Sequence, residues 1–397
     1  MSAHEIILGV GGGIAAYKSC DLLRRLQDGG FTVTVVPTPS SLNFVGQATW
    51  EALSGRSATT SVFEDVDQVR HVSLARLARG AIIAPATADL IARMAAGRAD
   101  DLLTNVALAA EFPILLVPAM HPAMWSNAAT QENIATLISR GFDVLPPDVG
   151  ALTSGDHGKG RFPTTAAIIE RFTSHTLAPQ DLVGRKILVT AGGTREAIDP
   201  VRFIGNKSSG KQGIAIAEAA LARGAEVTLI AANCALESSS KIRRIDVEST
   251  AELQDQLESH FPECDALFMA AAIADARPAE FSADKIKKDG FDEIALTKNP
   301  DLLATLASAK RSLQVVVAFA AETADDSQVL AREKMQRKGT DLIYLNDVSD
   351  GAIFGADNTE GLIIGSDKVI EFKEPISKIA LAHKLLNEAL LLLNKLG

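Results

Sequence analysis

Two glycine-rich turns are the features of this sequence whose residue types and spacing are best suited to chemistry. The first is GVGGGIAAYKS, which contains Gly11 and Gly13, and the second is VTAGGTRE, which begins at Val189. Each turn stands between a short apolar segment and a helical pattern. Glycines let the backbone approach an anion, and the free N–H groups at the start of a helix face that anion. The two turns therefore predict two phosphate sites.

Strand-like and helical patterns alternate around these turns. Continuous apolar strands that alternate with amphipathic helices indicate a parallel sheet covered on both faces. We therefore predict an α/β protein with two Rossmann-like, three-layer domains and mostly parallel sheets, in residues 1–172 and 186–397. The polar segment 173–185, which carries Pro179 and Gly184, is predicted to be the linker.

The expected elements follow from the periodicity of the apolar residues. A hairpin is expected over 362–372, and an amphipathic helix that packs on a core or on a second subunit is expected after Pro375. The predicted strands are 5–10, 32–36, 81–84, 114–117, 143–145, 187–190, 226–230, 266–270, 315–318 and 341–344.

The composition excludes several classes of protein. The 397 residues include 39 basic and 49 acidic ones, a net charge of −10, which argues against a nucleic-acid partner. The three cysteines have neither metal-ligand nor redox-motif spacing. We see no signal peptide, and the longest apolar runs, such as 266–274, are too short to span a membrane. We therefore expect a cytoplasmic protein without a membrane partner.

The first turn favours a mononucleotide over NAD. A dinucleotide site needs an acidic residue at the end of the second strand, and this strand ends in VVPTPSS, which offers Thr38 and Ser40. Hydroxyl groups suit a phosphate, so FMN fits better, although an ordinary polar loop would look the same. Small residues in the later segment APATADLIARMAAG would let a planar ring lie against the backbone. The predicted cofactor-binding residues are Gly11, Gly13, Thr38, Ser40, Ala84, Ala86, Thr87 and Ala88.

The second turn is followed by the segment NKSSGK, which precedes an apolar helical pattern. Ser208, Ser209 and Gly210 would lie at the start of that helix, where N–H groups are free for a phosphate. The segment lacks the frame of a Walker A loop. From these residues alone, a capped helix with a solvated basic face is equally acceptable.

Longer strings connect the chain to known families. GGGIAAYKS, HVSLAR, APATADLIARMAAG and VPAMHPAMW, in this order, resemble the FMN-dependent cysteine decarboxylases. TKNPDLLATL, FAAET and REKMQRKGTDLIYLND are similar to the phosphopantothenate–cysteine ligases. Together they resemble the bifunctional family of coenzyme A biosynthesis over almost the whole chain. This resemblance implies a flavodoxin-like FMN domain followed by a ligase domain.

The resemblance also implies the chemistry. The ligase step joins 4′-phosphopantothenate to cysteine with CTP and Mg²⁺, through an acyl-cytidylate. The decarboxylase step oxidises the cysteinyl thiol of the product at FMN, loses carbon dioxide and returns the hydride, which yields 4′-phosphopantetheine. Whether CTP or ATP is used stays open. The family further implies a homo-oligomer with trimeric flavin domains and dimeric ligase domains, together a dodecamer.

In the decarboxylase half, His71 matches the active-site base of the family, and an imidazole suits that role. The sequence departs from the family at two further positions. His121 stands where an asparagine usually binds the substrate carboxylate, and Ser154 stands where a cysteine usually donates a proton. Serine is a far weaker acid than cysteine, so His157 or water is an alternative donor.

In the ligase half, the resemblance places Asn206 beside the acyl-cytidylate and Lys285 among both the catalytic and the nucleotide-binding residues. Asp275 can accept hydrogen bonds from cytosine or ribose or help to hold Mg²⁺, although no metal ligand set is predicted. The other residues at nucleotide-binding positions are Met269, Ala270, Ala271, Pro300, Asp301, Leu302, Leu303, Phe319, Lys334 and Lys338.

Two other interpretations stay open. One is an active ligase fused to a flavin-binding domain that has lost decarboxylation or has a regulatory role, which His121 and Ser154 favour and His71 opposes. The other is a dehydrogenase with two Rossmann-like domains, which the missing acidic residue opposes.

Overall fold

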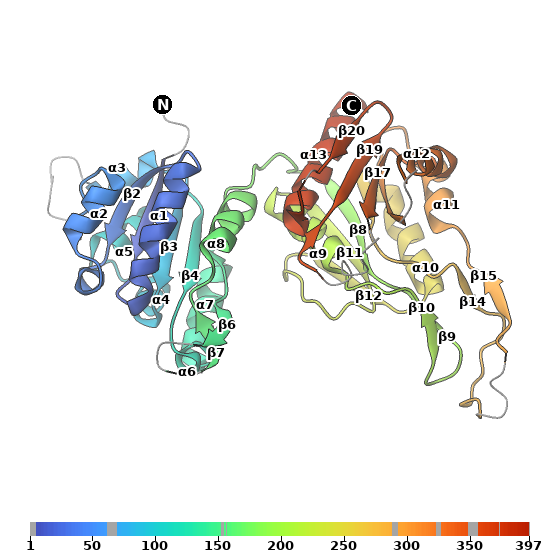
Figure 1. Cartoon of the computed structure of the whole chain (residues 1–397), viewed down its shortest axis with the longest axis horizontal. Coiled ribbons are helices and arrows are strands. Elements are labelled where there is room, and N and C mark those ends of the chain that lie inside the picture. Colours follow the sequence, from blue (N-terminus) through green and yellow to red (C-terminus); the bar gives the residue numbers. More distant parts are fainter. Residues whose placement is uncertain are drawn as a thin grey trace. The chain divides into compact units, whose positions relative to one another are not determined.

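Each half of the chain folds around its own β-sheet (Figure 1). The computed structural model describes residues 5–61, 70–151, 155, 157–287, 293–322, 327–347, 356–372 and 374–396. Only the backbone is described at residues 70, 71, 321, 322, 327–331 and 347. The chain divides into two units, Met1–Ala178 and Pro179–Gly397, which are described separately.

The first unit contains a five-stranded parallel sheet with the order β2-β1-β3-β4-β5. Its strands are almost entirely buried, as expected for a parallel sheet with two covered faces. They are β1 (Glu5–Val10), β2 (Thr32–Pro37), β3 (Ala81–Ala86), β4 (Ile114–Pro118) and β5 (Asp143–Val144). A separate hairpin is formed by β6 (Asp148–Ala151) and β7 (His157–Arg161).

Helices cover both faces of this sheet. One face packs on α1 (Lys18–Asp28), α2 (Gln47–Ser54) and α8 (Thr165–Arg171). The other face packs on α4 (Ala88–Ala95), α5 (Leu102–Ala109) and α7 (Ala128–Ser139). Among the described residues of this unit, the remaining elements are the 3-10 helices Ile14–Tyr17 and Pro39–Asn43, α3 (Arg70–Leu77), α6 (Pro122–Trp125) and a π-helical turn, Phe172–Thr176.

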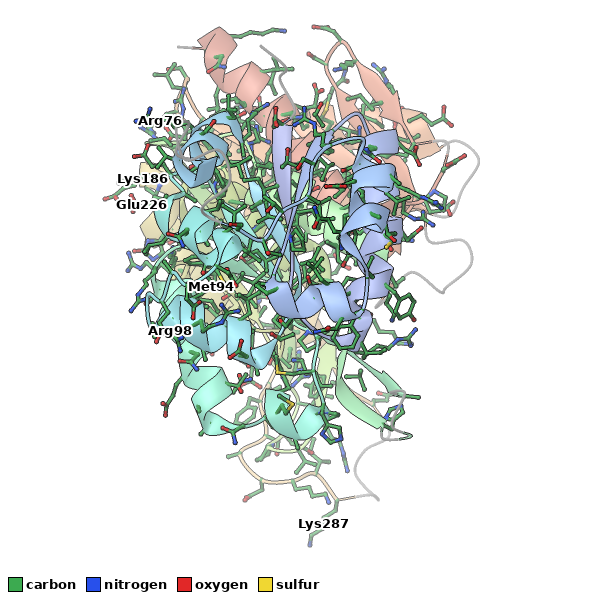
Figure 2. The ribbon with its side chains drawn as sticks, turned by 90° about the vertical axis from the view of Figure 1, so that its left-hand side faces the viewer. Arg76, Met94, Arg98, Lys186, Glu226 and Lys287 are labelled. Atoms are coloured by element: carbon green, nitrogen blue, oxygen red, sulfur yellow. The ribbon has the colours of Figure 1, made fainter. Side chains whose placement is uncertain are left out.

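The second unit contains an eight-stranded, mostly parallel sheet with the order β12-β11-β8-β13-β16-β17-β19-β20. Strands β8 and β11 begin side by side, with Lys186 opposite Glu226 (Figure 2). The parallel strands are β8 (Lys186–Gly192), β11 (Glu226–Ala232), β12 (Arg243–Val247), β13 (Ala266–Met269), β16 (Val315–Glu322) and β17 (Leu342–Asp347). The antiparallel strands β19 (Gly361–Gly365) and β20 (Val369–Glu371) extend the sheet.

Two layers of helices enclose this sheet. On one face lie α9 (Lys211–Ala222) and α13 (Lys378–Leu396), and on the other lie α10 (Thr250–His260) and α11 (Leu302–Ala309). Residue Met335 of α12 (Ser327–Lys338) packs against β17. The part of the unit that is described also contains a 3-10 helix, Phe261–Glu263, and short pairs of strands, namely β9 (Arg195–Ala197) with β10 (Phe203–Gly205), β14 (Ala276–Pro278) with β15 (Leu296–Lys298), and β18 (Asn358–Thr359) with β21 (Ile376–Ser377).

The predicted α/β class with three-layer organisation is confirmed, and each predicted strand overlaps an observed one. The hairpin and the final helix are also confirmed, and Leu386 and Leu393 of that helix are buried in the core. The edge strand β12 was missed because its sequence, RRIDV, is charged, and Arg244 forms an ion pair with Asp246 on its exposed side.

The predicted linker, residues 173–185, begins within a helical turn. The π-helical turn continues α8 to Thr176, and Phe172 at its start is fully buried in the core of the first unit. Thr176 donates a hydrogen bond of 2.6 Å to Asp143, which also pairs with Arg171. The contacts of this turn therefore belong to the first unit.

Candidate functional sites

The first candidate site lies at the carboxyl ends of β1, β2 and β3. These ends adjoin because β1 is paired in parallel with both neighbours. The amide of Gly11 donates a hydrogen bond of 3.0 Å to the Pro85 carbonyl, and the amide of Thr38 donates one of 2.9 Å to the Val10 carbonyl. Parallel strands thus bring together all three segments in which the sequence predicted cofactor-binding residues.

The glycine turn is in close contact with its two neighbouring segments. A Cβ atom on Gly11 would overlap the Pro85 carbonyl oxygen, and one on Gly12 would overlap the side chain of Ser40. A Cβ atom on Gly13 would lie 3.3 Å from the methyl group of Thr87. The turn therefore has no room for side chains at its first two positions, which is the property expected of a turn that presents backbone to a phosphate.

The two predicted hydroxyl groups differ in what they can do. Thr38 is 1% exposed and donates a hydrogen bond of 3.2 Å to the Val10 carbonyl. Ser40 is exposed, and its hydroxyl lies 3.2 Å from that of Thr38. Because the Thr38 proton is used inside the protein, Ser40 is the better hydroxyl donor to a ligand and Thr38 positions it.

The predicted residues after β3 have buried side chains or cap a helix. Ala84 and Ala86 are fully buried, so their side chains face the core. Thr87 accepts a hydrogen bond of 3.3 Å from the Leu90 amide and caps α4, which begins at Ala88. The turn therefore offers backbone rather than these methyl groups to a ligand, as the prediction of a ring lying against the backbone requires, and cofactor binding here stays a prediction.

Large apolar side chains are exposed near the same turn, and the sequence analysis did not single them out. Ile14 is 64% exposed, Tyr17 is 59% exposed and Phe44 is 46% exposed. They follow the ends of β1 and β2, beside the glycine turn and the Thr38–Ser40 segment. Exposed apolar groups beside a polar cradle suit a ligand with both an aromatic ring and a phosphate.

His121 precedes α6 and caps it. Its Nδ1 atom accepts a hydrogen bond of 3.2 Å from the Ala123 amide, so a neutral imidazole carries its proton on Nε2. The β6–β7 hairpin lies against this segment, because the Met120 amide donates to the Gly160 carbonyl at 3.0 Å. His157 begins β7 and is exposed. The Ser154 position and the His71 side chain lie outside the described residues, although the His71 backbone belongs to α3.

Gly11→Ala is expected to weaken flavin binding about tenfold, because the new methyl group must displace the Pro85 carbonyl that fixes the turn. The measurement is the dissociation constant of the flavin, from fluorescence titration of apoprotein from which the bound flavin has been removed. Gly46→Ser is the matched control, since a Cβ atom there meets nothing within 4 Å and serine is a good N-cap for α2. Equal affinity in the two variants would contradict the assignment of the turn.

The second candidate site surrounds the carboxyl end of β8. Gly192 ends this strand at φ +83°, and Gly193 bonds through its amide to the Ala232 carbonyl at 2.9 Å. Helix α9 begins beside this turn, and a Cβ atom on Gly213 would lie 2.5 Å from that of Ala191. The close approach places the start of α9, with Ser208, Ser209 and Gly210, at the carboxyl edge of the sheet, where ligands bind in open α/β folds.

Two cavities of about 430 and 570 Å³ lie at this edge. They share four lining residues, Ala271, Ile273, Asp275 and Phe319, so they form one continuous cleft. Of the predicted residues, the smaller cavity alone is lined by Asn206, Ser208, Ser209, Gly210, Ala270 and Lys334. The larger cavity alone is lined by Met269, Pro300, Asp301, Leu302, Leu303 and Lys338.

A buried polar network holds the loop between β13 and β14 in this cleft. Thr194 is fully buried and accepts a hydrogen bond of 2.9 Å from the Ala274 amide. Thr250 donates a hydrogen bond of 2.5 Å to the buried carboxylate of Glu196, and the Thr194 hydroxyl donates to the Thr250 oxygen at 3.1 Å. Asn299 donates to the Ala274 carbonyl at 2.8 Å. The loop that carries Asp275 is therefore fixed before any ligand binds.

Lys338 and Asp301 form an ion pair at the rim of the larger cavity. Asp301 also caps α11 by accepting a hydrogen bond of 3.1 Å from the Ala304 amide. Partial burial by itself raises the pKa of Asp301, but Lys338 and the Ala304 amide outweigh it and hold that pKa below its ordinary value. Asp301 is therefore ionised at neutral pH and keeps Lys338 at the cavity.

Lys285 is exposed and is not among the described residues that line the cleft. It belongs to the segment 279–287, which follows β14 and extends away from the sheet (Figure 1), and Lys287 projects from the end of this segment (Figure 2). The Ile286 amide donates to Asp199 at 3.2 Å, and the Ser282 amide donates to the Ile198 carbonyl at 3.1 Å. These bonds fasten the loop to the β9–β10 hairpin, which is where the structure places Lys285.

Several residues of the cleft were missed by the sequence analysis. Asn299 and Lys298 line the larger cavity, and Asn346, Thr359 and Lys378 line the smaller one. Ser377 followed by Lys378 is recognisable in sequence as a helix start. Nothing local indicates that this start faces a cavity whose lining includes Asn206 and Lys207, more than a hundred positions away.

In the part of the chain that the structure describes, no group of three or more histidine, cysteine or acidic side chains is arranged to hold a metal ion. Within the same residues, none of the helices combines the length and apolar character needed to cross a bilayer.

Comparison with known proteins agrees with the division of the chain into the units Met1–Ala178 and Pro179–Gly397. Residues 1–177 match the model of the Flavoprotein family, and residues 182–392 match that of the DNA/pantothenate metabolism flavoprotein C-terminal domain. The coenzyme A biosynthesis bifunctional protein CoaBC of Mycobacterium tuberculosis is 48% identical over 401 residues, covering 96% of this chain and 95% of the relative. That of Mycolicibacterium smegmatis is 47% identical, covering 98% and 97%.

A more distant relative covers the chain to the same extent. The protein of the same name from Haemophilus influenzae is 41% identical over 396 residues, covering 98% of this chain and 97% of the relative. Similarity of this degree across both units cannot come from one shared domain. The chain therefore belongs to the family of bifunctional coenzyme A biosynthesis proteins, in which a flavoprotein decarboxylase domain precedes a ligase domain.

Proposed function

We propose that this chain performs two consecutive steps of coenzyme A biosynthesis. The second unit, with the ligase assigned to residues 186–397, joins 4′-phosphopantothenate to cysteine with CTP. The first unit, with the decarboxylase assigned to residues 1–172, converts 4′-phosphopantothenoylcysteine to 4′-phosphopantetheine. The observation that carries the proposal is the cleft of the second unit, which is lined by every predicted nucleotide-binding residue except Lys285.

The cleft suits carboxylate activation by a nucleoside triphosphate. A carboxylate oxygen of phosphopantothenate bonds to the α-phosphorus of CTP, the bond from that phosphorus to the bridging oxygen breaks, and pyrophosphate leaves. The cysteine amine then attacks the acyl carbon and releases CMP. Lys334 and Lys338 would offset the charge on the phosphates, and Asn206, held by a 2.9 Å bond to the Ile273 carbonyl, would orient the acyl group.

The first unit fits a flavin mononucleotide, because a glycine cradle, the exposed hydroxyl of Ser40 and exposed apolar side chains lie together. FMN, when bound, supplies reversible two-electron chemistry at the cysteinyl thiol. His71 would act as the base, and the Nε2–H group of His121 would bind the substrate carboxylate. Ser154 is assigned to the flap over the substrate without a chemical role.

Several further properties are part of the proposal. Mg²⁺ would enter bound to the triphosphate, because phosphate oxygens and water supply most of the ligands of this ion. Asp275, whose carboxylate lines both cavities, could supply a further oxygen ligand. We also propose trimeric flavin domains, dimeric ligase domains and a cytoplasmic location, as the family resemblance implies.

The test is a coupled assay of the purified chain with cysteine, phosphopantothenate and either CTP or ATP. We expect CMP and pyrophosphate in equal amounts with CTP, followed by carbon dioxide. Phosphopantothenoylcysteine supplied directly should release carbon dioxide without any nucleotide. Absence of CMP and pyrophosphate would contradict the ligase assignment, and AMP in place of CMP would contradict the choice of nucleotide.

The alternative function, a ligase with a regulatory flavin domain, is favoured by His121 and Ser154, where the family has other residues. It predicts CMP release with no carbon dioxide from supplied phosphopantothenoylcysteine. Carbon dioxide release at a rate comparable to that of ligation would exclude it.

A further inference from the structure

The smaller cavity of the second unit has one wall that the proposed function does not use. This wall is the start of α13, which lies beside the start of α9. Gln212 donates a hydrogen bond of 3.3 Å to the Lys378 carbonyl, across 166 positions in sequence. Ser377 caps the helix by accepting a bond of 3.1 Å from the Ala380 amide. Lys378, the first residue of α13, is therefore held in the lining of the cavity.

The charge in this cavity is strongly unbalanced. Its lining contains four lysines, Lys207, Lys211, Lys334 and Lys378, and a single carboxylate, Asp275. Lys211 also pairs at 2.6 Å with Asp357, a side chain that is 89% exposed and thus well screened by water. Among the described residues, the cavity therefore holds more positive than negative charge, and an anion would relieve the repulsion.

Lys378 and Lys211 lie close enough to affect each other. The Nζ atom of Lys378 donates to the Ala356 carbonyl, and its amide donates to the Asp357 carbonyl at 3.0 Å. Partial burial, and then the charge of Lys211, lower the pKa of Lys378, against the opposing effect of Asp357. The segment 356–357 thus holds both ammonium groups at one end of the cavity.

A neutral donor completes this end of the cavity. Thr359 donates a hydrogen bond of 2.9 Å to the amide oxygen of Asn346, and both residues line the cavity. Because the amide oxygen of Asn346 is engaged, the group that it can offer to a ligand is its NH₂. Two ammonium groups and an amide NH₂ are donors only, which matches the oxygens of a phosphate.

We propose that Lys378 and Lys211 form a phosphate-binding subsite at the α13 end of the cleft, in which both ammonium groups contact the phosphate of a ligase substrate. The inference rests on the proposed ligase function. The phosphate belongs either to the pyrophosphate end of the nucleotide or to the phosphate group of phosphopantothenate. In the first case the pair stabilises the charge that builds on pyrophosphate as its bond to the α-phosphorus breaks, and in the second it orients the attacking carboxylate.

The test compares Lys378→Met with Lys384→Met in the full chain. Lys384 is an exposed lysine on the same helix, 5.7 Å from the centre of the Phe372 ring, and does not belong to the cleft lining. We expect Lys378→Met to raise the KM for either CTP or phosphopantothenate about tenfold, and Lys384→Met to change neither KM. Lys378→Arg keeps the positive charge and should return that KM most of the way to the wild-type value. Thermal unfolding of each variant shows that the fold is kept.

The pattern of change identifies the source of the phosphate. A higher KM for CTP with weaker inhibition by pyrophosphate assigns the subsite to the nucleotide, and a higher KM for phosphopantothenate alone assigns it to that substrate. Unchanged KM values, or equal effects in Lys384→Met, overturn the proposal. If the wild-type chain has no ligase activity, the proposed function fails separately. Calorimetric titration with inorganic pyrophosphate and with inorganic phosphate then tests the subsite without ligase activity. The subsite is overturned if neither anion binds the wild-type chain, or if each anion binds the wild type and Lys378→Met with equal affinity.

Discussion

His71→Asn is expected to reduce carbon dioxide release from phosphopantothenoylcysteine by about 10²- to 10⁴-fold, the usual contribution of a general acid–base group. Asparagine can hydrogen-bond to the substrate, but it cannot take up and return a proton at neutral pH. Residue 71 belongs to α3, between the glycine turn and β3, in the unit that matches the Flavoprotein family. The measurement is single-turnover release of carbon dioxide by the flavin-loaded variant.

The same polypeptide supplies a control for this prediction. Release of CMP and pyrophosphate belongs to the second unit, so it should continue at the wild-type rate in His71→Asn. His260→Asn makes the same chemical change at the end of α10 and should alter neither reaction. Carbon dioxide release within tenfold of wild type in His71→Asn would exclude His71 as the base.

Gly192→Ala is expected to abolish CTP binding and to destabilise the second unit by more than the roughly 1–3 kcal/mol that a non-glycine residue at positive φ costs. Gly192 has φ +83°, and a Cβ atom there would overlap the Ala232 carbonyl oxygen. That oxygen accepts the Gly193 amide at 2.9 Å, so the overlap displaces the turn beside which α9 begins. Calorimetric titration with CTP and denaturant unfolding measure the two effects.

Gly184→Ala separates the cost of backbone conformation from the cost of overlap. Gly184 has φ +80°, close to that of Gly192, but a Cβ atom there meets nothing within 4 Å. We expect this variant to lose about 1–2 kcal/mol and to bind CTP normally. Flavin content should stay unchanged in both variants, because the flavin site belongs to the first unit. Equal stability and equal CTP affinity in Gly192→Ala and Gly184→Ala would contradict the role of the turn.

Features set by neighbouring residues could be predicted from the sequence. The strands β1 and β8 and the glycine turns after them follow from short apolar segments and from glycine, which act within a few positions. Because adjacent parallel strands run in the same direction, the turns that follow them lie at the same, carboxyl edge of the sheet. For this reason the three segments predicted to bind the cofactor lie together, and so do most of the residues predicted to bind the nucleotide.

The direction and surroundings of individual side chains could not be predicted in this way. Thr38 and Ser40 have equivalent hydroxyl groups in sequence, yet Thr38 is bonded to Val10 inside the protein and Ser40 is exposed. Lys285 and Lys338 are both lysines at predicted nucleotide-binding positions, but Lys338 lines the cleft and Lys285 belongs to a loop bonded to the β9–β10 hairpin.

The sequence by itself determined that this chain has two α/β units, that each carries a glycine-rich turn after its first strand, and which chemistry its family resemblance implies. Only the tertiary structure decided which charges meet, as in the pairing of α13 with α9 that brings Lys378 beside Lys211. The reason is that a turn or a strand is encoded by residues a few positions apart. A cavity is formed by the packing of elements that are distant in sequence, and no local pattern records that packing.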